Sequence, residues 1–368
     1  MKNAALDFKK IRYIPGLDGV RFIAVSIVMI SHFGLGKLVP GGFGVTIFFF
    51  LSGFLITTIL AQEISQTETV SIGYFYIRRF LRLSPELLLF LALAIAIDSY
   101  VGSPPKAGDI LSALTYTTNY YIIYLQNISP NGTADFSWGH LWSLAVEEHY
   151  YITFPLVLIA SINQRRFLTL FFLLALLGCL LWRCYVAGGG IDQRNWNLAY
   201  GYLASEARYD SIAYGAAFSL MCQNTHRISP FTSKVSFCSG LFLILVSLAI
   251  RDEFFRETVR YSVQGIGLTL IFSHLYLSHE VSPIVNILEK FPMKWGGRLS
   301  YGAYLWHLEV NDNLNRIIQT SFPQLEAHII AITEILGFPI TFSLAWLSYQ
   351  FVAKPFLVLR RKYSLQLR

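Results

Sequence analysis

Residues 41–57 read GGFGVTIFFFLSGFLIT, an apolar run without a charged side chain. Similar runs recur along the 368-residue chain, and each approaches the roughly 20 apolar residues that a membrane-spanning helix needs. They begin near Leu17, Phe43, Glu86, Leu141, Phe167, Ser211, Phe237, Ser262, Leu299 and Ile329. The sequence therefore predicts an all-α, polytopic integral membrane protein with about ten transmembrane helices.

The composition supports this fold class. Hydrophobic residues make up 54% of the chain and charged residues only 14%, whereas soluble domains carry about 25% charged residues. This argues against a cytosolic enzyme, a disordered protein and a nucleic-acid binder. The four cysteines lie in or beside apolar runs without the spacing of metal ligands, so we expect buried thiols and no metal site.

The distribution of basic residues predicts the topology. With both termini in the cytoplasm, about twice as many Lys and Arg side chains fall on the cytoplasmic side as on the outer side, as the positive-inside rule requires. This holds only if residues 110–125 do not cross the membrane, so we expect a re-entrant or interfacial segment there. The first run lacks a convincing signal-peptide cleavage site, so we expect it to be an uncleaved first helix. We expect one membrane domain over residues 1–368, with no appended soluble domain.

Two ionisable side chains lie in the first apolar run. Arg21 and His32 are eleven positions apart, which places them on one face of a straight α-helix, about 16 Å apart along its axis. Ionisable residues within spans are costly and commonly functional. The alternative is that Arg21 snorkels toward the interface and His32 only satisfies a neighbouring helix.

Two further motifs follow along the chain. Ser52 and Gly53 lie in the middle of the second run, where small residues allow close helix packing or leave a narrow space for a ligand. Arg78, Arg79 and Arg82 precede the third run. Arg78 and Arg82 share a helical face and can grip phosphates, although a basic cluster here also serves as a topology signal.

The segment HLWSLAVEEHYYITFPL, residues 140–156, is expected to enter the membrane from the outside. Glu147 lies four residues from both Ser143 and Tyr151, so the three form one polar stripe on a helix. A carboxylate at this depth can orient an imidazole such as that of His32. The alternative is an interfacial aromatic belt with exposed polar groups, which suits the two residues after Glu147 better.

The second half of the chain holds four more candidates. Arg208 and Asp210 begin the sixth run and can form a local ion pair. Tyr304 and His307 lie inside the ninth run. His307 also begins an HxxxxD pattern, which we interpret as coincidence because it lies inside an apolar span.

Together these stretches resemble the acyltransferase family 3 membrane proteins, which O-acylate extracytoplasmic glycans, lipopolysaccharide and some small molecules. The resemblance rests on IPGLDGVRFIAVSIVMISHFG, GGFGVTIFFFLSGFLIT, RRFLRLSP, WSLAVEEHYY, RYD and SYGAYLWH. It implies ten spans in the bacterial cytoplasmic (inner) membrane and transfer from acyl-CoA, used from the cytoplasmic side, to a hydroxyl on the outer side. Acyl-CoA, by default acetyl-CoA, is then a co-substrate, and no permanently bound cofactor is expected.

The resemblance also assigns roles to residues. His32 and Glu147 match the catalytic positions, and Arg21, Arg78, Arg79 and Arg82 match donor-binding positions. Residues that contact substrate or support the site would be Asp18, Ser52, Gly53, Ser143, Arg208, Asp210, Tyr304 and His307. Family members often carry Glu before a Lys-Pro or Arg-Pro step, where this chain has Ala353.

The expected function is an O-acyltransferase, most simply an O-acetyltransferase, in which His32 is a general base or is transiently acylated and Glu147 orients it. Its partners would be membrane lipid, acyl-CoA and an extracytoplasmic glycan such as a lipopolysaccharide or exopolysaccharide unit, with no nucleic acid. A polytopic transporter or a polyprenyl-linked glycan-processing protein is the alternative. Against these, the chain has no evident inverted repeat and no DxD motif.

Overall fold

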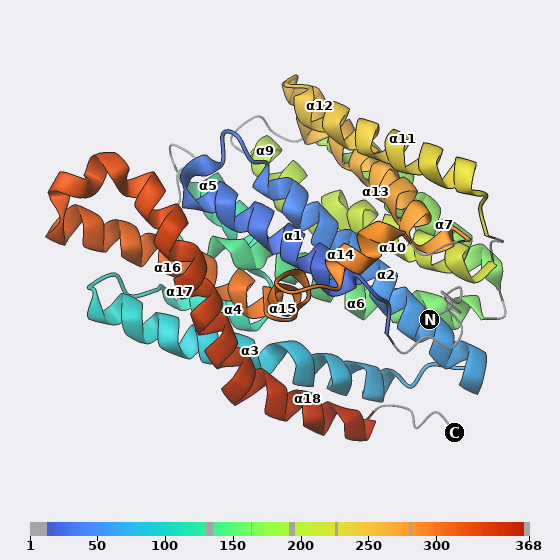
Figure 1. Ribbon diagram of the computed structural model, residues 1–368, viewed down its shortest axis with the longest axis horizontal. Helices are drawn as coiled ribbons and strands as arrows, with labels where there is room; N and C mark the ends of the chain where they lie inside the picture. Colours follow the sequence, from blue (N-terminus) through green and yellow to red (C-terminus); the bar gives the residue numbers. More distant parts are fainter. Residues whose placement is uncertain are drawn as a thin grey trace. The chain divides into compact units, whose positions relative to one another are not determined.

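The computed structural model describes residues 13–129, 135–162, 164–190, 196–224, 227–279 and 282–363. These residues form helices connected by short loops, and the only strand-like pairing among them is an isolated bridge between Ile228 and Ser278. The all-α prediction is therefore confirmed (Figure 1). Both chain ends lie outside the described residues, so their cytoplasmic placement stays a prediction.

The chain divides into two compact units. The first, here called the histidine unit, comprises residues 17–45, 71–110 and 289–368. Its helical elements are α1 (Leu17–Ile30), a π-helical turn (Ser31–Leu35), α3 (Ile72–Tyr100), α15 (Met293–Arg298), α16 (Ser300–Ser321), a 3₁₀ turn (Pro323–His328), α17 (Ile329–Ser348), a second π turn (Tyr349–Ala353), α18 (Lys354–Arg360) and a final 3₁₀ turn (Arg361–Tyr363). α16 and α17 pack along each other (Figure 1).

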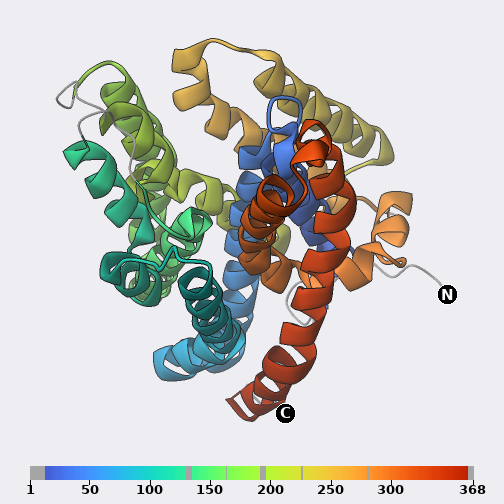
Figure 2. The same cartoon turned by 90° about the vertical axis from the view of Figure 1, so that its left-hand side faces the viewer.

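The second, here called the arginine unit, comprises residues 1–16, 46–70 and 111–288. Its elements are α5 (Thr118–Ile128), a 3₁₀ turn (Gly139–Leu141), α6 (Trp142–Ser161), α7 (Arg165–Leu173), a π turn (Leu174–Gly178), α8 (Cys179–Ala187), α9 (Trp196–Leu203), α10 (Ser205–Asn224), α11 (Pro230–Ala249), α12 (Glu253–Glu257), α13 (Val259–Leu277) and α14 (Pro283–Leu288). α11 and α13 lie side by side in this unit (Figure 2). Two helices, α2 (Gly41–Thr67) and α4 (Ala107–Leu114), begin in the histidine unit and end in the arginine unit.

A π-helical turn positions the first-helix histidine. α1 ends at Ile30, and His32 lies in the wider turn Ser31–Leu35. Gly34 in this turn has φ +123°, a conformation that costs other residues steric strain. Single π turns often occur at functional sites. Because α-helical spacing stops before His32, the shared face and the separation from Arg21 calculated for a straight α-helix do not apply unchanged.

In the part of the chain that the structure describes, six helical segments are long and apolar enough to cross a membrane: Leu17–Leu35, Gly41–Thr67, Ile72–Tyr100, Arg166–Ala187, Pro230–Ala249 and Pro323–Tyr363. The protein is accordingly a multi-pass membrane protein. The other predicted spans coincide with α6, α10, α13 and α16, which have 19 to 22 residues but do not reach the same apolar composition. A total of ten crossings therefore stays a prediction.

The structure changes the predicted start of the third span and defines the helices within residues 110–125. The third predicted run starts at Glu86, yet α3 begins at Ile72 and contains Pro85 in its interior. The three arginines of RRFLRLSP thus lie on the same helix as the span, not in a preceding loop. Residues 110–125 are divided between α4 and α5, which have 8 and 11 residues. Neither is long enough to cross a hydrocarbon core of about 30 Å.

Candidate functional site

The histidine unit brings His32 and His307 into direct contact. Nδ1 of His32 lies 2.8 Å from Nε2 of His307, and the two rings stack with centroids 5.0 Å apart. Nδ1 of His307 lies 2.7 Å from the main-chain carbonyl oxygen of Tyr304. The His307 side chain is fully buried, whereas His32 is exposed.

These contacts determine which ring nitrogens carry protons. A carbonyl oxygen only accepts hydrogen bonds, so Nδ1 of His307 must donate to Tyr304. In neutral His307 the other nitrogen, Nε2, is then an acceptor, and Nδ1–H of His32 donates to it. Neutral His32 is left with a lone pair on Nε2. This is the nitrogen that a general base or a nucleophile requires.

The sequence placed His307 and Tyr304 among the supporting residues, and the structure assigns them a defined arrangement around His32. Asp312, the last residue of the HxxxxD pattern, is exposed and accepts a hydrogen bond from Asn311. The pairing of the two histidines was not predicted. They are 275 residues apart, and the only available signal was the presence of each imidazole within an apolar run.

Arg21 and Asp18 form an ion pair on α1. Nη1 of Arg21 lies 3.6 Å from one Asp18 carboxylate oxygen, and Nε of Arg298 lies 3.8 Å from the other. The close approach of α15 to α1 depends on Gly297, where a Cβ atom would overlap the main chain of Asp18. Two guanidinium groups thus share one carboxylate, which leaves this end of α1 with excess positive charge.

A second positive region surrounds the start of α3. Nη1 of Arg78 donates to the main-chain oxygen of Tyr363 over 3.0 Å. Arg360 on α18 is near enough to Arg78, Arg79 and Arg361 for their charges to repel. We call these four arginines the basic cluster. Such an arrangement suits a polyanionic ligand. Arg82 lies one turn further along α3 and is half-buried.

Glu147 lies on α6 in the arginine unit. The Tyr151 hydroxyl donates to its Oε2 over 2.9 Å, as expected for positions i and i+4. Ser143 shares this helix, but its hydroxyl donates to the His140 carbonyl oxygen instead of to Glu147. Because Glu147 and His32 belong to different units, their pairing stays a prediction.

Gly53 serves helix packing. A Cβ atom at this position would overlap the main-chain oxygen of Ile212, and one at Gly215 would overlap that of Phe50. The facing glycines let α2 and α10 approach closely, as small residues do in membrane proteins. This favours the packing interpretation of Gly53 over an open space for a ligand, while the neighbouring Ser52 is half-buried.

A local ion pair between Arg208 and Asp210 was one interpretation of the sequence, and it does not form among the described residues. Asp210 pairs instead with Arg183 on α8, with Nη2 and Oδ2 2.6 Å apart and both side chains fully buried. Residues two positions apart on a helix point in nearly opposite directions, so Arg208 and Asp210 face different neighbours. Arg183 lies within the candidate span Arg166–Ala187.

All three guanidinium nitrogens of Arg183 donate hydrogen bonds. Its guanidinium also donates to the main-chain oxygens of Thr258 and Ala207 and to the Ser262 hydroxyl. A buried ion pair needs such additional bonds to offset the loss of hydration of both charges. Arg183 and Asp210 thus join α8, α10 and the start of α13 through a locally neutral network.

Arg208 has very different surroundings. Its side chain is also fully buried, but its one hydrogen bond goes from Nη2 to the Thr46 hydroxyl over 3.2 Å. Nε and Nη1 have no hydrogen-bond partner among the described residues. Each unsatisfied buried donor costs about 1–3 kcal/mol, and more when the group is charged.

A polar cluster around His149 was not predicted, since the sequence favoured an exposed belt here. Nδ1 of His149 lies 2.7 Å from the Ser205 hydroxyl, and its ring stacks on Tyr120. Tyr120 and Tyr200 each donate a hydrogen bond to Glu206. Burial and the bond to Glu206 raise the pKa of both tyrosine hydroxyls, so these phenols remain protonated donors near neutral pH.

Several named proteins are similar to this chain over most of its length. The chain is 26% identical over 367 residues to the peptidoglycan O-acetyltransferase OatA of Listeria monocytogenes, a match that covers 94% of this chain and 56% of the relative. It is 28% identical over 365 residues to the Bacillus subtilis protein YrhL, provisionally named a peptidoglycan O-acetyltransferase, covering 94% of this chain and 55% of that protein. A Staphylococcus aureus protein provisionally named an O-acetyltransferase is 28% identical over 373 residues, 95% of this chain and 58% of the relative.

This chain therefore spans less than three fifths of the length of these relatives. No solved structure matches it. A family model described as an acyltransferase domain matches residues 14–350, which includes both histidines and both buried arginines. The match takes in nearly all described residues of both units, and the chain belongs to the acyltransferase family 3 membrane proteins.

Proposed function

We propose that this protein is a membrane O-acetyltransferase that transfers an acetyl group from acetyl-CoA on the cytoplasmic side to a hydroxyl of an extracytoplasmic glycan. Family membership and the names of the relatives support the reaction class. Peptidoglycan is the acceptor named for OatA and, provisionally, for YrhL. It is the first acceptor to test, before lipopolysaccharide or exopolysaccharide units.

The observation that carries the proposal is the orientation of the histidine pair. The bond from Nδ1–H of His32 to His307 leaves the lone pair on Nε2 of His32 for chemistry. As general base, this nitrogen removes the proton from the acceptor hydroxyl while the oxygen attacks the thioester carbonyl. The new O–C bond forms, the C–S bond breaks, and the proton passes from His32 to the CoA thiolate.

A covalent route uses the same nitrogen. Nε2 attacks the thioester, and acetyl-His32 forms with loss of CoA thiolate. The acceptor hydroxyl then attacks the acetyl carbonyl, so that the O–C bond forms, the C–N bond to His32 breaks, and the hydroxyl proton passes to the CoA thiolate. In both routes the charge that develops on His32 is stabilised through its Nδ1–H bond to neutral His307. We further propose that Glu147 orients the imidazole or contacts the acceptor.

We assign donor binding to the positive regions of the histidine unit. Arg21 with Arg298, and the basic cluster of Arg78, Arg79, Arg360 and Arg361, suit the phosphates of CoA. Arg82 adds charge on the same helix. Acetyl-CoA would bind as a co-substrate from the cytoplasm, in the inner membrane of a bacterium. Ten spans with both termini inside are the matching topology.

The test uses full-length protein in detergent or proteoliposomes with radiolabelled acetyl-CoA and peptidoglycan fragments. His32→Ala should abolish ester formation, while the control His279→Ala, an exposed histidine after α13, should retain it. Retained transfer by folded His32→Ala protein would contradict the proposal. Labelling without acceptor separates the two routes, since only the covalent one gives a hydroxylamine-labile acetyl group that depends on His32.

A further inference from the structure

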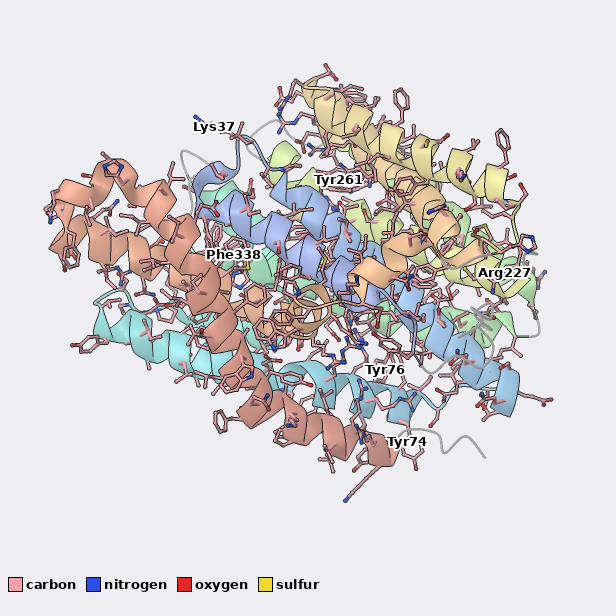
Figure 3. The ribbon with its side chains drawn as sticks, in the orientation of Figure 1. Lys37, Tyr74, Tyr76, Arg227, Tyr261 and Phe338 are labelled. Atoms are coloured by element: carbon pink, nitrogen blue, oxygen red, sulfur yellow. The ribbon has the colours of Figure 1, made fainter. Side chains whose placement is uncertain are left out.

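Arg208 is enclosed by four aromatic rings of the arginine unit. Its guanidinium carbon lies 3.9 Å from the ring centroid of Tyr261, which is labelled in Figure 3 on α13. The centroids of Tyr202, Phe49 and Trp142 follow at 5.3, 5.5 and 5.8 Å. Rings at these distances favour a cation electrostatically, and we call this arrangement the Arg208 cage.

The cage surrounds the Arg208 guanidinium but leaves most of its N–H groups without a hydrogen bond among the described residues. Arg183, equally buried in the same unit, has hydrogen bonds from all three guanidinium nitrogens and an acidic partner. Arg208 donates only to Thr46, and its Nε and Nη1 have no hydrogen-bond partner among the residues that the structure describes. Helix packing explains the burial of Arg183, but it leaves the N–H groups on two nitrogens of Arg208 unexplained.

The charges around the cage favour an anion. Glu257 is near enough to interact electrostatically with Arg208, but also with Arg256 and Arg260. It makes no hydrogen bond or ion pair with Arg208 in the described part of the chain. Asp210 is occupied by Arg183. Glu253 is also near Glu257, so two glutamates face Arg256 and Arg260, and the charge of Arg208 is the one left in excess.

The walls of the cage indicate the kind of molecule that carries this anion. Phe49, Trp142 and Tyr261 are buried, and Tyr202 is half-buried. Aromatic walls with few polar groups are typical of small-molecule sites, and they offer apolar faces to the C–H face of a sugar ring. Planar N–H donors suit a carboxylate.

We propose that the Arg208 cage binds the carboxylate of an acidic sugar in the acceptor glycan. This inference rests on the proposed function, because it specifies the acceptor of that reaction. The test measures equilibrium binding by calorimetry and acetyl transfer, using the purified full-length chain. The probes are a galacturonic acid tetrasaccharide and the same oligosaccharide with its carboxylates reduced to alcohols. The variants are Arg208→Gln, Arg208→Lys and the control Arg251→Gln, an exposed arginine after α11.

Wild-type protein and Arg251→Gln should bind the acidic form about tenfold more tightly than the reduced form, as expected for a charge-assisted hydrogen bond. Arg208→Gln should bind the two oligosaccharides with equal affinity. In the transfer assay its KM for the acidic oligosaccharide should rise, with little change in kcat. Arg208→Lys keeps the cation, supports folding if the Gln variant fails to fold, and should lose most of the preference because an ammonium cannot replace planar donors.

Wild-type protein that does not discriminate between the two oligosaccharides would overturn the assignment, as would either Arg208 variant with the preference intact. The two proposals fail separately. Selective binding without ester formation would reject acetyl transfer and retain the cage as a carboxylate site. Ester formation without selectivity would reject the cage and retain acetyl transfer.

Discussion

Removing the His307 imidazole is the sharpest perturbation of the proposed chemistry. His307 accepts Nδ1–H of His32 and is itself fixed by the Tyr304 carbonyl oxygen. In His307→Ala nothing holds the proton of neutral His32 on Nδ1, so part of the population carries it on Nε2. That tautomer has no lone pair where the base is needed. The charged form of His32 also loses its acceptor.

The size of the effect follows from the hydrogen bond that is lost. A bond to a charged group contributes about 1.5–3 kcal/mol, and about 1.36 kcal/mol corresponds to a tenfold change in rate. The turnover of His307→Ala should therefore fall about 10- to 150-fold. His307→Gln offers an amide oxygen as acceptor and should recover part of this loss, whereas a purely structural role would not distinguish the two variants by their turnover.

The assay compares initial rates of acetyl transfer at saturating acetyl-CoA, normalised to folded protein measured by size-exclusion chromatography. His279→Ala controls for the loss of an exposed imidazole. Turnover of His307→Ala within threefold of wild type would refute the tautomer argument. Equal losses in the Ala and Gln variants, together with lower thermal stability of both, would show that His307 acts through packing alone.

Three further perturbations test other parts of the structure. Asp210→Asn leaves the buried Arg183 charge without its partner and should destabilise the protein by about 3–5 kcal/mol; an unchanged thermal midpoint would contradict the buried pair. Gly53→Ala should abolish expression of folded protein because the added Cβ overlaps the backbone of α10, whereas Gly73→Ala, in open space, should express normally. Arg360→Gln should raise KM for acetyl-CoA about tenfold with kcat retained, and an unchanged KM argues against donor binding at the basic cluster.

The apolar runs predicted the helices well because hydrophobicity along the chain is a local property. The boundaries were less predictable. The third run was expected at Glu86, yet α3 starts at Ile72 because the segment before it, with Arg78 and Arg82 one turn apart, also continues as a helix. Pro85 lies inside this helix, and prolines are tolerated within the helices of membrane proteins.

Side-chain partners were predicted only where they are neighbours on one helix. Tyr151 does bond to Glu147 four residues away. Pairing of Asp210 with Arg208 on the same helix was one interpretation, whereas Asp210 pairs with Arg183, 27 residues away. Sequence spacing predicts contacts within one helix but not between helices. For this reason the sequence did not predict the contact between His32 and His307.

The two buried arginines show why membrane burial alone does not identify a functional side chain. Both lost hydration on folding, which is costly for any charge. For Arg183 the protein supplies a carboxylate, two carbonyls and a hydroxyl, so its burial is explained by the structure that it holds together. For Arg208 it supplies one hydroxyl and aromatic faces. Asp210 stands two residues from Arg208 and could have neutralised it locally, yet α10 directs that carboxylate to the other arginine. The N–H groups left over are therefore the ones that a ligand from outside the chain can satisfy.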